Sequence, residues 1–200
     1  MESSMTTHLS STSSNETIKG QCRCGCVTYE FPKASDVDLE DKNLSELYKR
    51  LIVPPEKQKF PERGGHSNKW RACHCHCAAC RQTAGALVVS CAYIPAEHFK
   101  ITRKEKTGIY RASNHAYREF CLICGAALFF YEDRDINGVD ITLATITTPR
   151  LFDYFELVNH VWVEDAADIV LDKDGKGGGL ATIFNDDLPR MKRDSASEAY

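Results

Sequence analysis

The ten cysteines of this 200-residue chain constrain its fold more than any other feature, because nine of them fall into three short clusters. Thiolates that stand one or two residues apart can converge on one small cation without a long backbone detour, as zinc ligands usually do. The clusters are Cys22-Arg23-Cys24-Gly25-Cys26, Cys73-His74-Cys75-His76-Cys77-Ala78-Ala79-Cys80 and Cys121-Leu122-Ile123-Cys124. Only Cys91 stands apart, in an apolar stretch where we expect it in the core.

Metal binding explains these clusters better than disulfide bonding. The N-terminal residues have no apolar core like that of a secretory signal, and the lack of arginine before Arg23 argues against a mitochondrial presequence. We therefore expect a cytoplasmic protein with reduced thiols. An even number of cysteines leaves a disulfide framework open as an alternative, although Cys-x-Cys pairs close poorly. No apolar run approaches the ~20 residues that span a bilayer, so no membrane partner is expected. A net charge of -3 gives no electrostatic reason to expect nucleic acid.

The length is that of one domain with polar ends. Residues 1–16, rich in Ser and Thr, are predicted to be a disordered tail, residues 17–185 the domain, and residues 186–200 a polar C-terminal tail. Within the domain, residues 33–69 are predicted to form an insertion, with an amphipathic helix that ends before Pro54 and a polar loop after it.

Short runs of β-branched and aromatic residues, separated by turn residues, predict a mainly β fold with a few short helices. Residues 77–80 are expected to turn, and residues 95–99 to form a short helical turn. The expected strands are two between Ile18 and Phe31, followed by Trp70–Cys77, Ala86–Ile94, Phe99–Ile101, Gly108–Arg111, Tyr117–Phe120, Ala126–Tyr131, Val139–Ile146 and Val158–Val163.

Counting ligands assigns the clusters to two metal sites. The first and third clusters supply two thiolates each, which together close a four-sulfur zinc site of the structural type. Such a site would join segments about 100 residues apart in the sequence and fasten the two halves of the domain. Its ligands are Cys22, Cys24, Cys121 and Cys124.

The central cluster then offers Cys75, Cys77 and Cys80 to a second zinc ion. Three protein ligands leave a fourth position open, which is typical of a catalytic or substrate-binding site. Three thiolates also make bound water a weaker acid and favour a soft fourth ligand such as a substrate thiolate. A second structural zinc remains an alternative, with Cys73 or His76 closing the site. A deaminase-type zinc is not expected, because its characteristic Glu and Pro are missing from the cluster.

Several residues close to the predicted ligands have more than one possible role. Cys26 and Cys73 could be ligands, but we favour free thiols that pack as small apolar groups. Strand alternation turns His74 and His76 away from the thiolates, which favours packing or hydrogen bonding over ligation for His76. Arg81 could meet a substrate carboxylate or offset the thiolate charge. We expect His160 in the core, and the acidic pairs 132–133 and 186–187 in solvated turns.

The three clusters with their flanking residues resemble the glutathione-dependent formaldehyde-activating enzyme (GFA)/CENP-V family. Weaker similarity lies in residues 95–99, 110–113 and 160–163, and the resemblance covers about residues 17–165. The motifs that carry it are Gly20-Gln21-Cys22-Arg23-Cys24-Gly25, Cys75-His76-Cys77-Ala78-Ala79-Cys80-Arg81 with Gly85, and Phe120-Cys121-Leu122-Ile123-Cys124-Gly125.

This resemblance implies a β-tent fold of the Mss-four-like kind, with the same two zinc sites that ligand counting assigns. It also implies a carbon–sulfur lyase-type reaction, in which glutathione adds to formaldehyde to give S-hydroxymethylglutathione. We therefore predict a zinc enzyme that acts on a glutathione or other thiol adduct of a small electrophile. The alternative is a non-catalytic zinc-binding β-domain that binds a protein partner or a thiol.

Overall fold

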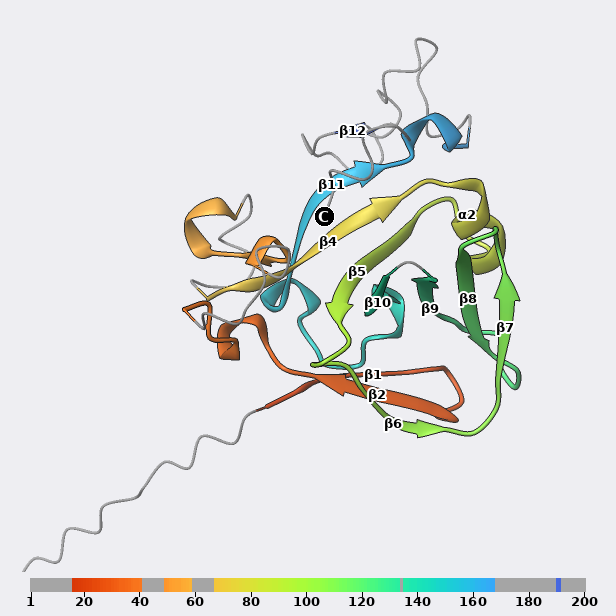
Figure 1. Ribbon diagram of the computed structural model, residues 1–200, viewed down its shortest axis with the longest axis horizontal. Coiled ribbons are helices and arrows are strands. Elements are labelled where there is room, and N and C mark those ends of the chain that lie inside the picture. The colour runs from red at the N-terminus through yellow and green to blue at the C-terminus, as the bar shows by residue number, and fades with distance from the viewer. Residues whose placement is uncertain (1–15, 41–48, 59–66, 134, 168–189, 192–200) are drawn as a thin grey trace, which may run out of the picture.

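The computed structural model describes residues 16–40, 49–58, 67–133, 135–167 and 190–191. Two sheets dominate these residues (Figure 1). The smaller sheet has the strand order β1-β2-β6, and the larger has the order β12-β11-β4-β5-β10-β9-β8-β7, with β3 paired to β4 at the side. Among the described residues the structure is therefore mainly β, as the sequence predicts.

Helical elements in the described residues are short and lie between strands. They are the α-helix α2 (Ala78–Ala84) and the 3-10 turns Ala34–Asp36, Pro55–Lys57, Leu143–Thr145, Leu151–Asp153 and Val163–Asp165. The strands are β1 (Ile18–Gln21), β2 (Val27–Phe31), β3 (Ile52–Val53), β4 (Lys69–Cys75), β5 (Val89–Pro95), β6 (Lys100–Lys104), β7 (Thr107–Arg111), β8 (Ala116–Cys121), β9 (Ala127–Glu132), β10 (Asp135–Thr142), β11 (Phe155–Val161) and β12 (Arg190–Met191).

The core lies between the two sheets and is rich in aromatic rings. From β2, Tyr29 packs edge-on against Phe129 of β9 with ring centroids 5.3 Å apart, and Phe31 meets Phe155 of β11 at 6.2 Å. All four rings are buried. Edge-to-face pairs of this kind add about 0.5–1.5 kcal/mol each to the stabilisation from burial, so β2 is held firmly against the large sheet.

Most of the expected strands are present, and the hairpin pairings follow the sequence pattern. Strands β1 and β2 pair with Gln21 opposite Thr28, and β7 and β8 pair with Gly108 opposite Phe120. Strand β11 begins at Phe155, three residues before the expected start.

The expected turn at residues 77–80 is wrong, because these residues begin α2. The Cys77 side chain caps the helix by accepting a hydrogen bond from the Cys80 backbone N–H at 3.3 Å. Gly85, at φ 63°, ends the helix in the left-handed conformation that glycine adopts without strain. The chain reverses there, so β5 begins at Val89 instead of Ala86.

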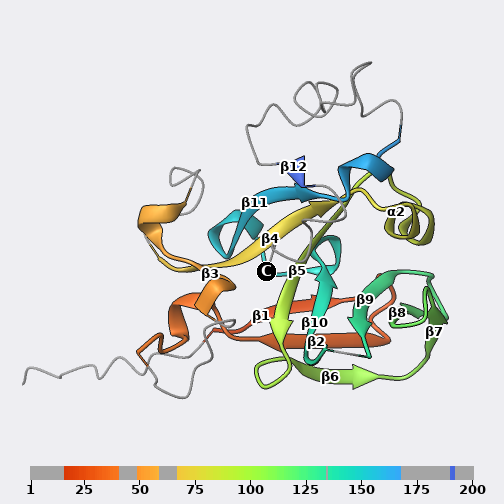
Figure 2. The same ribbon diagram turned by 45° about the horizontal axis from the view of Figure 1, so that its top comes forward.

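Strand β4 lies between β11 and β5 in the large sheet (Figures 1 and 2). It pairs antiparallel with β5 and in parallel with β11. In this register Cys75 lies between Val89 and Val161. Helix α2 follows at the end of β4, and β8 and β9 lie beyond β10 in the same sheet.

Much of the predicted 33–69 helix and loop falls outside the described residues, but its described part joins the main core. Leu51 and Ile52 are buried, and the Leu51 carbonyl accepts a hydrogen bond from the Arg71 backbone N–H at 2.7 Å. The N-terminal tail also lies outside the described residues except for residue 16. Within the predicted C-terminal tail, β12 pairs in parallel with β11. The described residues contain no helix long and apolar enough to cross a membrane.

Candidate metal centres

Two tight turns from different sheets bring four cysteines together; we call them the four-cysteine cluster. Cys22 and Cys24 lie in the turn between β1 and β2, and Cys121 and Cys124 lie in the turn between β8 and β9. The Cys24 sulfur is 3.5 Å from that of Cys22 and 3.6 Å from that of Cys121. All four sulfurs lie within 4.8 Å of one another, across a sequence separation of 97 residues between Cys24 and Cys121.

Glycine makes both turns of this cluster possible. Gly25 and Gly125 follow the second cysteine of each pair with φ of 75° and 72°, which side-chain-bearing residues rarely adopt. Their backbone N–H groups bond back to the carbonyls of Cys22 and Cys121 at 3.0 and 2.9 Å. The Ala126 backbone N–H also bonds the Cys124 sulfur and lowers the pKa of that thiol to about 6. The backbone thus favours the thiolate form of Cys124, whereas burial raises the pKa of Cys121 to about 11.

A second group, the three-cysteine cluster, comes from one short segment. Cys75 ends β4, while Cys77 caps α2 and Cys80 lies in its first turn. Their three sulfurs also lie within 4.8 Å of one another. Among the described residues, no histidine, cysteine or carboxylate supplies a fourth ligand atom to this group.

Both clusters fit a zinc ion by their donor atoms and spacing. Zinc binds thiolate at ~2.3 Å, so the sulfurs of a tetrahedral site stand ~3.8 Å apart. The sulfur–sulfur distances of 3.5 and 3.6 Å in the four-cysteine cluster are close to this value. Soft thiolates in a tetrahedral arrangement also favour zinc over magnesium or calcium, which prefer oxygen. Either cluster could therefore hold a zinc ion.

In the three-cysteine cluster, hydrogen bonds between the thiols shift the pKa values of Cys75 and Cys77 in opposite directions. Hydrogen bonds from the thiols of Cys75 and then Cys80 hold the pKa of Cys77 far below its ordinary value, and the nearby Arg118 charge acts in the same direction. The hydrogen bonds of Cys75 with Cys77 and Cys80, together with burial, raise the pKa of Cys75. A divalent cation would let all three sulfurs ionise, because its charge replaces the shared protons.

A cavity of about 420 Å³, here called the sulfur cavity, opens beside the three-cysteine cluster. Its size falls within the roughly 300–1,000 Å³ range of ligand pockets. It is lined from α2, β5, β8, β9, β10 and the end of β11, with Cys75, Cys77, Cys80, Cys91, Arg118, Phe130, Asp140 and Trp162 among the lining residues.

Arg118, on β8, lines the sulfur cavity, and the sequence did not single it out. One guanidinium nitrogen donates to the Cys77 sulfur at 3.9 Å, and the group lies over the Phe130 ring at 4.8 Å from its centroid. It forms no salt bridge with a carboxylate among the described residues, and its buried Nε has no hydrogen-bond partner there. An arginine with spare donors beside a thiolate is suited to an anionic or oxygen-bearing ligand.

Arg81, which the sequence suggested could meet a substrate carboxylate or offset the thiolate charge, bonds two backbone carbonyls. Its Nε donates to the His76 carbonyl at 3.2 Å and its Nη2 to the Asp165 carbonyl at 2.9 Å. It therefore ties α2 to the residues that follow β11. Arg118 lies in a strand about 40 residues further along the chain, and the pattern Ala116-Tyr117-Arg118-Glu119-Phe120-Cys121 gives no local signal for it.

Three neighbouring histidines, His74, His76 and His160, lie on the other side of β4 from the thiolates. His76 and His160 are fully buried and share a hydrogen bond between Nε2 and Nδ1 at 2.9 Å, while His74 Nδ1 bonds the Ser90 hydroxyl at the same distance. These bonds join β4 to β11 and β5. Of the remaining cysteines, Cys73 lies 3.5 Å from Cys91, sulfur to sulfur, across the β4–β5 pair, and Cys26 is half-buried. None of these three belongs to either cluster.

With this geometry established, comparison with known proteins identifies the family. The family model described as glutathione-dependent formaldehyde-activating enzyme matches residues 65–165, which span the whole three-cysteine cluster, Arg118 and two of the four other clustered cysteines. The chain belongs to this family.

Among solved structures, a crystal structure of a Rhodobacter sphaeroides protein is similar at 18% identity with a TM-score of 0.42, covering 69% of this chain and 98% of that one. The comparison with curated proteins gives no match.

Proposed function

We propose that this protein is a zinc enzyme of the carbon–sulfur lyase type, which makes or breaks the bond between the sulfur of glutathione, or a related thiol, and the carbon of a small electrophile such as formaldehyde. One observation carries the proposal. The three-cysteine cluster faces a cavity of ligand size, and no fourth protein ligand closes it among the described residues. Family membership supports the same chemistry.

In this proposal each chain holds two zinc ions. Cys22, Cys24, Cys121 and Cys124 hold the structural ion, and Cys75, Cys77 and Cys80 hold the second. Zinc in the second site would supply a soft Lewis acid that favours thiolate over thiol in its fourth position. Glutathione is chiefly an intracellular thiol, so we propose a cytoplasmic protein.

The chain's own groups would orient the reaction. In the addition direction, the thiol gives up its proton, its sulfur bonds the carbonyl carbon, and the π electrons of the carbonyl move to oxygen, which then takes up one proton. The oxygen carries negative charge as the bond forms. Arg118, beside the Cys77 sulfur, can donate hydrogen bonds to it without losing its own proton. Cleavage is the reverse of these steps.

The test is the rate at which formaldehyde exchanges between its free and glutathione-bound forms, measured by NMR against the uncatalysed exchange. The unmodified protein should accelerate exchange, and Cys77→Ser should return it to the uncatalysed rate. The control Cys26→Ser changes a cysteine outside both clusters and should keep the acceleration. If the zinc-loaded, folded protein accelerates nothing, the non-catalytic zinc-binding β-domain becomes the better account.

A further inference from the structure

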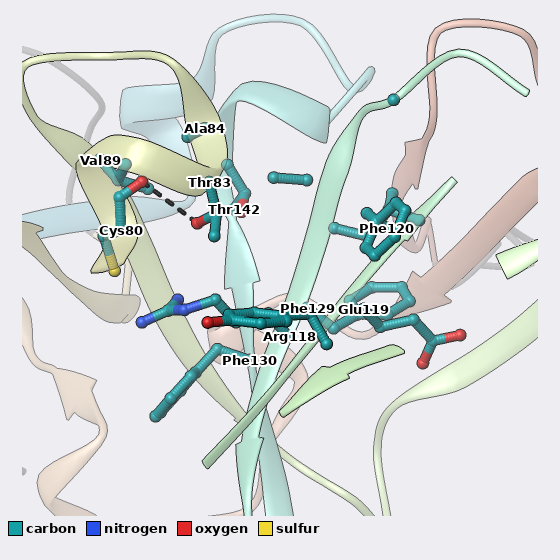
Figure 3. A pocket seen from close by; sticks show the side chains of 14 residues that line it. Cys80, Thr83, Ala84, Val89, Arg118, Glu119, Phe120, Phe129, Phe130 and Thr142 are labelled. Carbon is teal, nitrogen blue, oxygen red and sulfur yellow. Dashed lines mark hydrogen bonds between the residues drawn. The ribbon is translucent and has the colours of Figure 1, made fainter. Parts of the chain in front are cut away.

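A second cavity of about 410 Å³ lies directly beside the sulfur cavity; we call it the apolar cavity. The two share part of their lining, so a ligand anchored at the three-cysteine cluster can extend from one into the other. Figure 3 shows the arrangement, with the Arg118 guanidinium directed to the side where the Cys80 sulfur lies. The shared residues are Cys80, Val89, Arg118, Phe130 and Thr142.

The lining of this second cavity is mostly carbon. Phe120, Phe129, Phe130, Ala84 and Ala127 contribute to it, together with the buried Leu128. Such a surface gains free energy by covering apolar groups and offers little to a charged ligand.

Two of its polar side chains, Thr83 and Glu119, are already engaged by the protein itself. The Thr83 hydroxyl donates to the Ala79 carbonyl at 2.7 Å within α2. The Glu119 carboxylate points away from Arg118 in Figure 3 and pairs with Lys104 at 2.5 Å. The guanidinium of Arg118, on the border with the sulfur cavity, is a charged group with donors available to a ligand, and Tyr110 and Thr142 also line the apolar cavity.

Formaldehyde alone would leave this space empty. It has two non-hydrogen atoms, and even at the ~30 Å³ that one water molecule occupies per atom it needs only roughly 60 Å³. We propose that the apolar cavity binds the substituent of the electrophile, so that the substrates include aldehydes with alkyl or aryl groups. This inference rests on the proposed function, because it takes the thiol sulfur to lie at the three-cysteine cluster.

The position of Arg118 lets the thiol sulfur lie at the three-cysteine cluster while the substituent of the electrophile lies in the apolar cavity. A carbonyl carbon that bonds the sulfur near Cys77 has its oxygen within reach of the guanidinium. The third substituent of that carbon then passes Phe130 and Thr142, which line both cavities. The bond changes are those of the proposed addition, and no further reactant is needed.

S-alkylglutathiones test this directly, because they carry a carbon substituent on sulfur as the adduct does but do not revert to thiol and aldehyde. Calorimetry with the zinc-loaded protein would compare glutathione, S-methylglutathione and S-hexylglutathione. Each buried methylene group is worth about fourfold in affinity, so S-hexylglutathione should bind at least roughly tenfold more tightly than S-methylglutathione. Equal affinities for the two thioethers, with glutathione itself bound, would overturn this inference and leave the proposed function intact. Absence of glutathione binding would overturn both.

Substitutions locate the effect. Ala84→Phe and, separately, Ala127→Leu add bulk to the apolar cavity and should remove the gain from the hexyl chain, with glutathione affinity unchanged. Gln82→Phe is the matched control, because Gln82 is exposed on the same helix and lines neither cavity, and should keep the gain. Loss of the gain in either filled variant supports the assignment. A gain that persists in both, with unchanged zinc content, would place the alkyl chain elsewhere and overturn it.

Discussion

The two cysteine clusters offer the same donor atoms, and they differ in what each one connects. The four-cysteine cluster joins the β1–β2 turn of the small sheet to the β8–β9 turn of the large sheet, across 97 residues of sequence between Cys24 and Cys121. The three-cysteine cluster comes from residues 75–80 alone and faces a cavity. We therefore propose that the closed set, which connects distant segments, serves stability, and that the open set on one local segment serves binding.

The largest effect should follow loss of a ligand from the four-cysteine cluster. Cys121 is fully buried, and Cys121→Ser should leave the two sheets without their cross-link. Zinc binding of ~10–16 kcal/mol is comparable with the ~5–15 kcal/mol that stabilises a whole domain, so the variant should not fold cooperatively. Circular dichroism during heating, with zinc content measured in parallel, checks this. A melting temperature within a few degrees of the unmodified protein would contradict a structural role.

Loss of a ligand from the three-cysteine cluster should instead separate function from stability. Cys80→Ser should remain folded, hold one zinc ion fewer per chain, and lose the acceleration of formaldehyde exchange by about 100-fold or more, because the thiol has lost its anchor. Metal analysis, thermal melting and NMR exchange give the three readings. A variant that unfolds like Cys121→Ser would mean that both clusters are structural.

A smaller loss should follow removal of the charge beside the thiolate. Arg118→Met keeps much of the packing against Phe130 but removes the hydrogen bonds to the carbonyl oxygen. Hydrogen bonds to charged groups contribute ~1.5–3 kcal/mol, so the exchange rate should fall roughly 10- to 150-fold while zinc content stays constant. The control Arg111→Met removes an exposed arginine that pairs with Asp133 on the same sheet. Equal effects of the two substitutions would remove Arg118 from the mechanism.

The smallest effects should come from the cysteines outside both clusters. Cys73→Ser places a hydroxyl beside Cys91 in a buried position and should cost about 1 kcal/mol of unfolding free energy. Cys26→Ser, at a half-buried position, should cost less. Both variants should retain zinc and activity. Denaturant unfolding with metal analysis checks this, and loss of zinc from either variant would enlarge the ligand set beyond seven sulfurs.

The sequence predicted the parts of this structure that depend on local spacing. Ligand sets are readable because Cys22 and Cys24, or Cys121 and Cys124, can reach one ion only through a tight turn, and Gly25 and Gly125 mark those turns. The hairpins are readable for the same reason, since alternation and turn residues act over a few positions.

What the sequence did not show depends on distant parts of the chain or on unusual local chemistry. Helix α2 was missed because it is short and is capped by a cysteine thiol, which is not among the usual capping residues. The sequence drew attention to Arg81 because it stands next to the predicted ligand Cys80, and it gave no reason to consider Arg118. Arg118 reaches the cluster only because β8 lies in the same sheet as β4, and strand order cannot be read from the residues of β8 themselves.

The most direct test of the central claim is X-ray absorption at the zinc edge of the fully loaded protein, with and without glutathione. If one ion has four protein sulfurs and the other three, the average number of sulfur ligands per zinc should rise from about 3.5 to about 4 when glutathione binds. Cys80→Ser should abolish this rise. An average of four sulfurs before glutathione is added, or no change after it, would contradict the open site from which the function is argued.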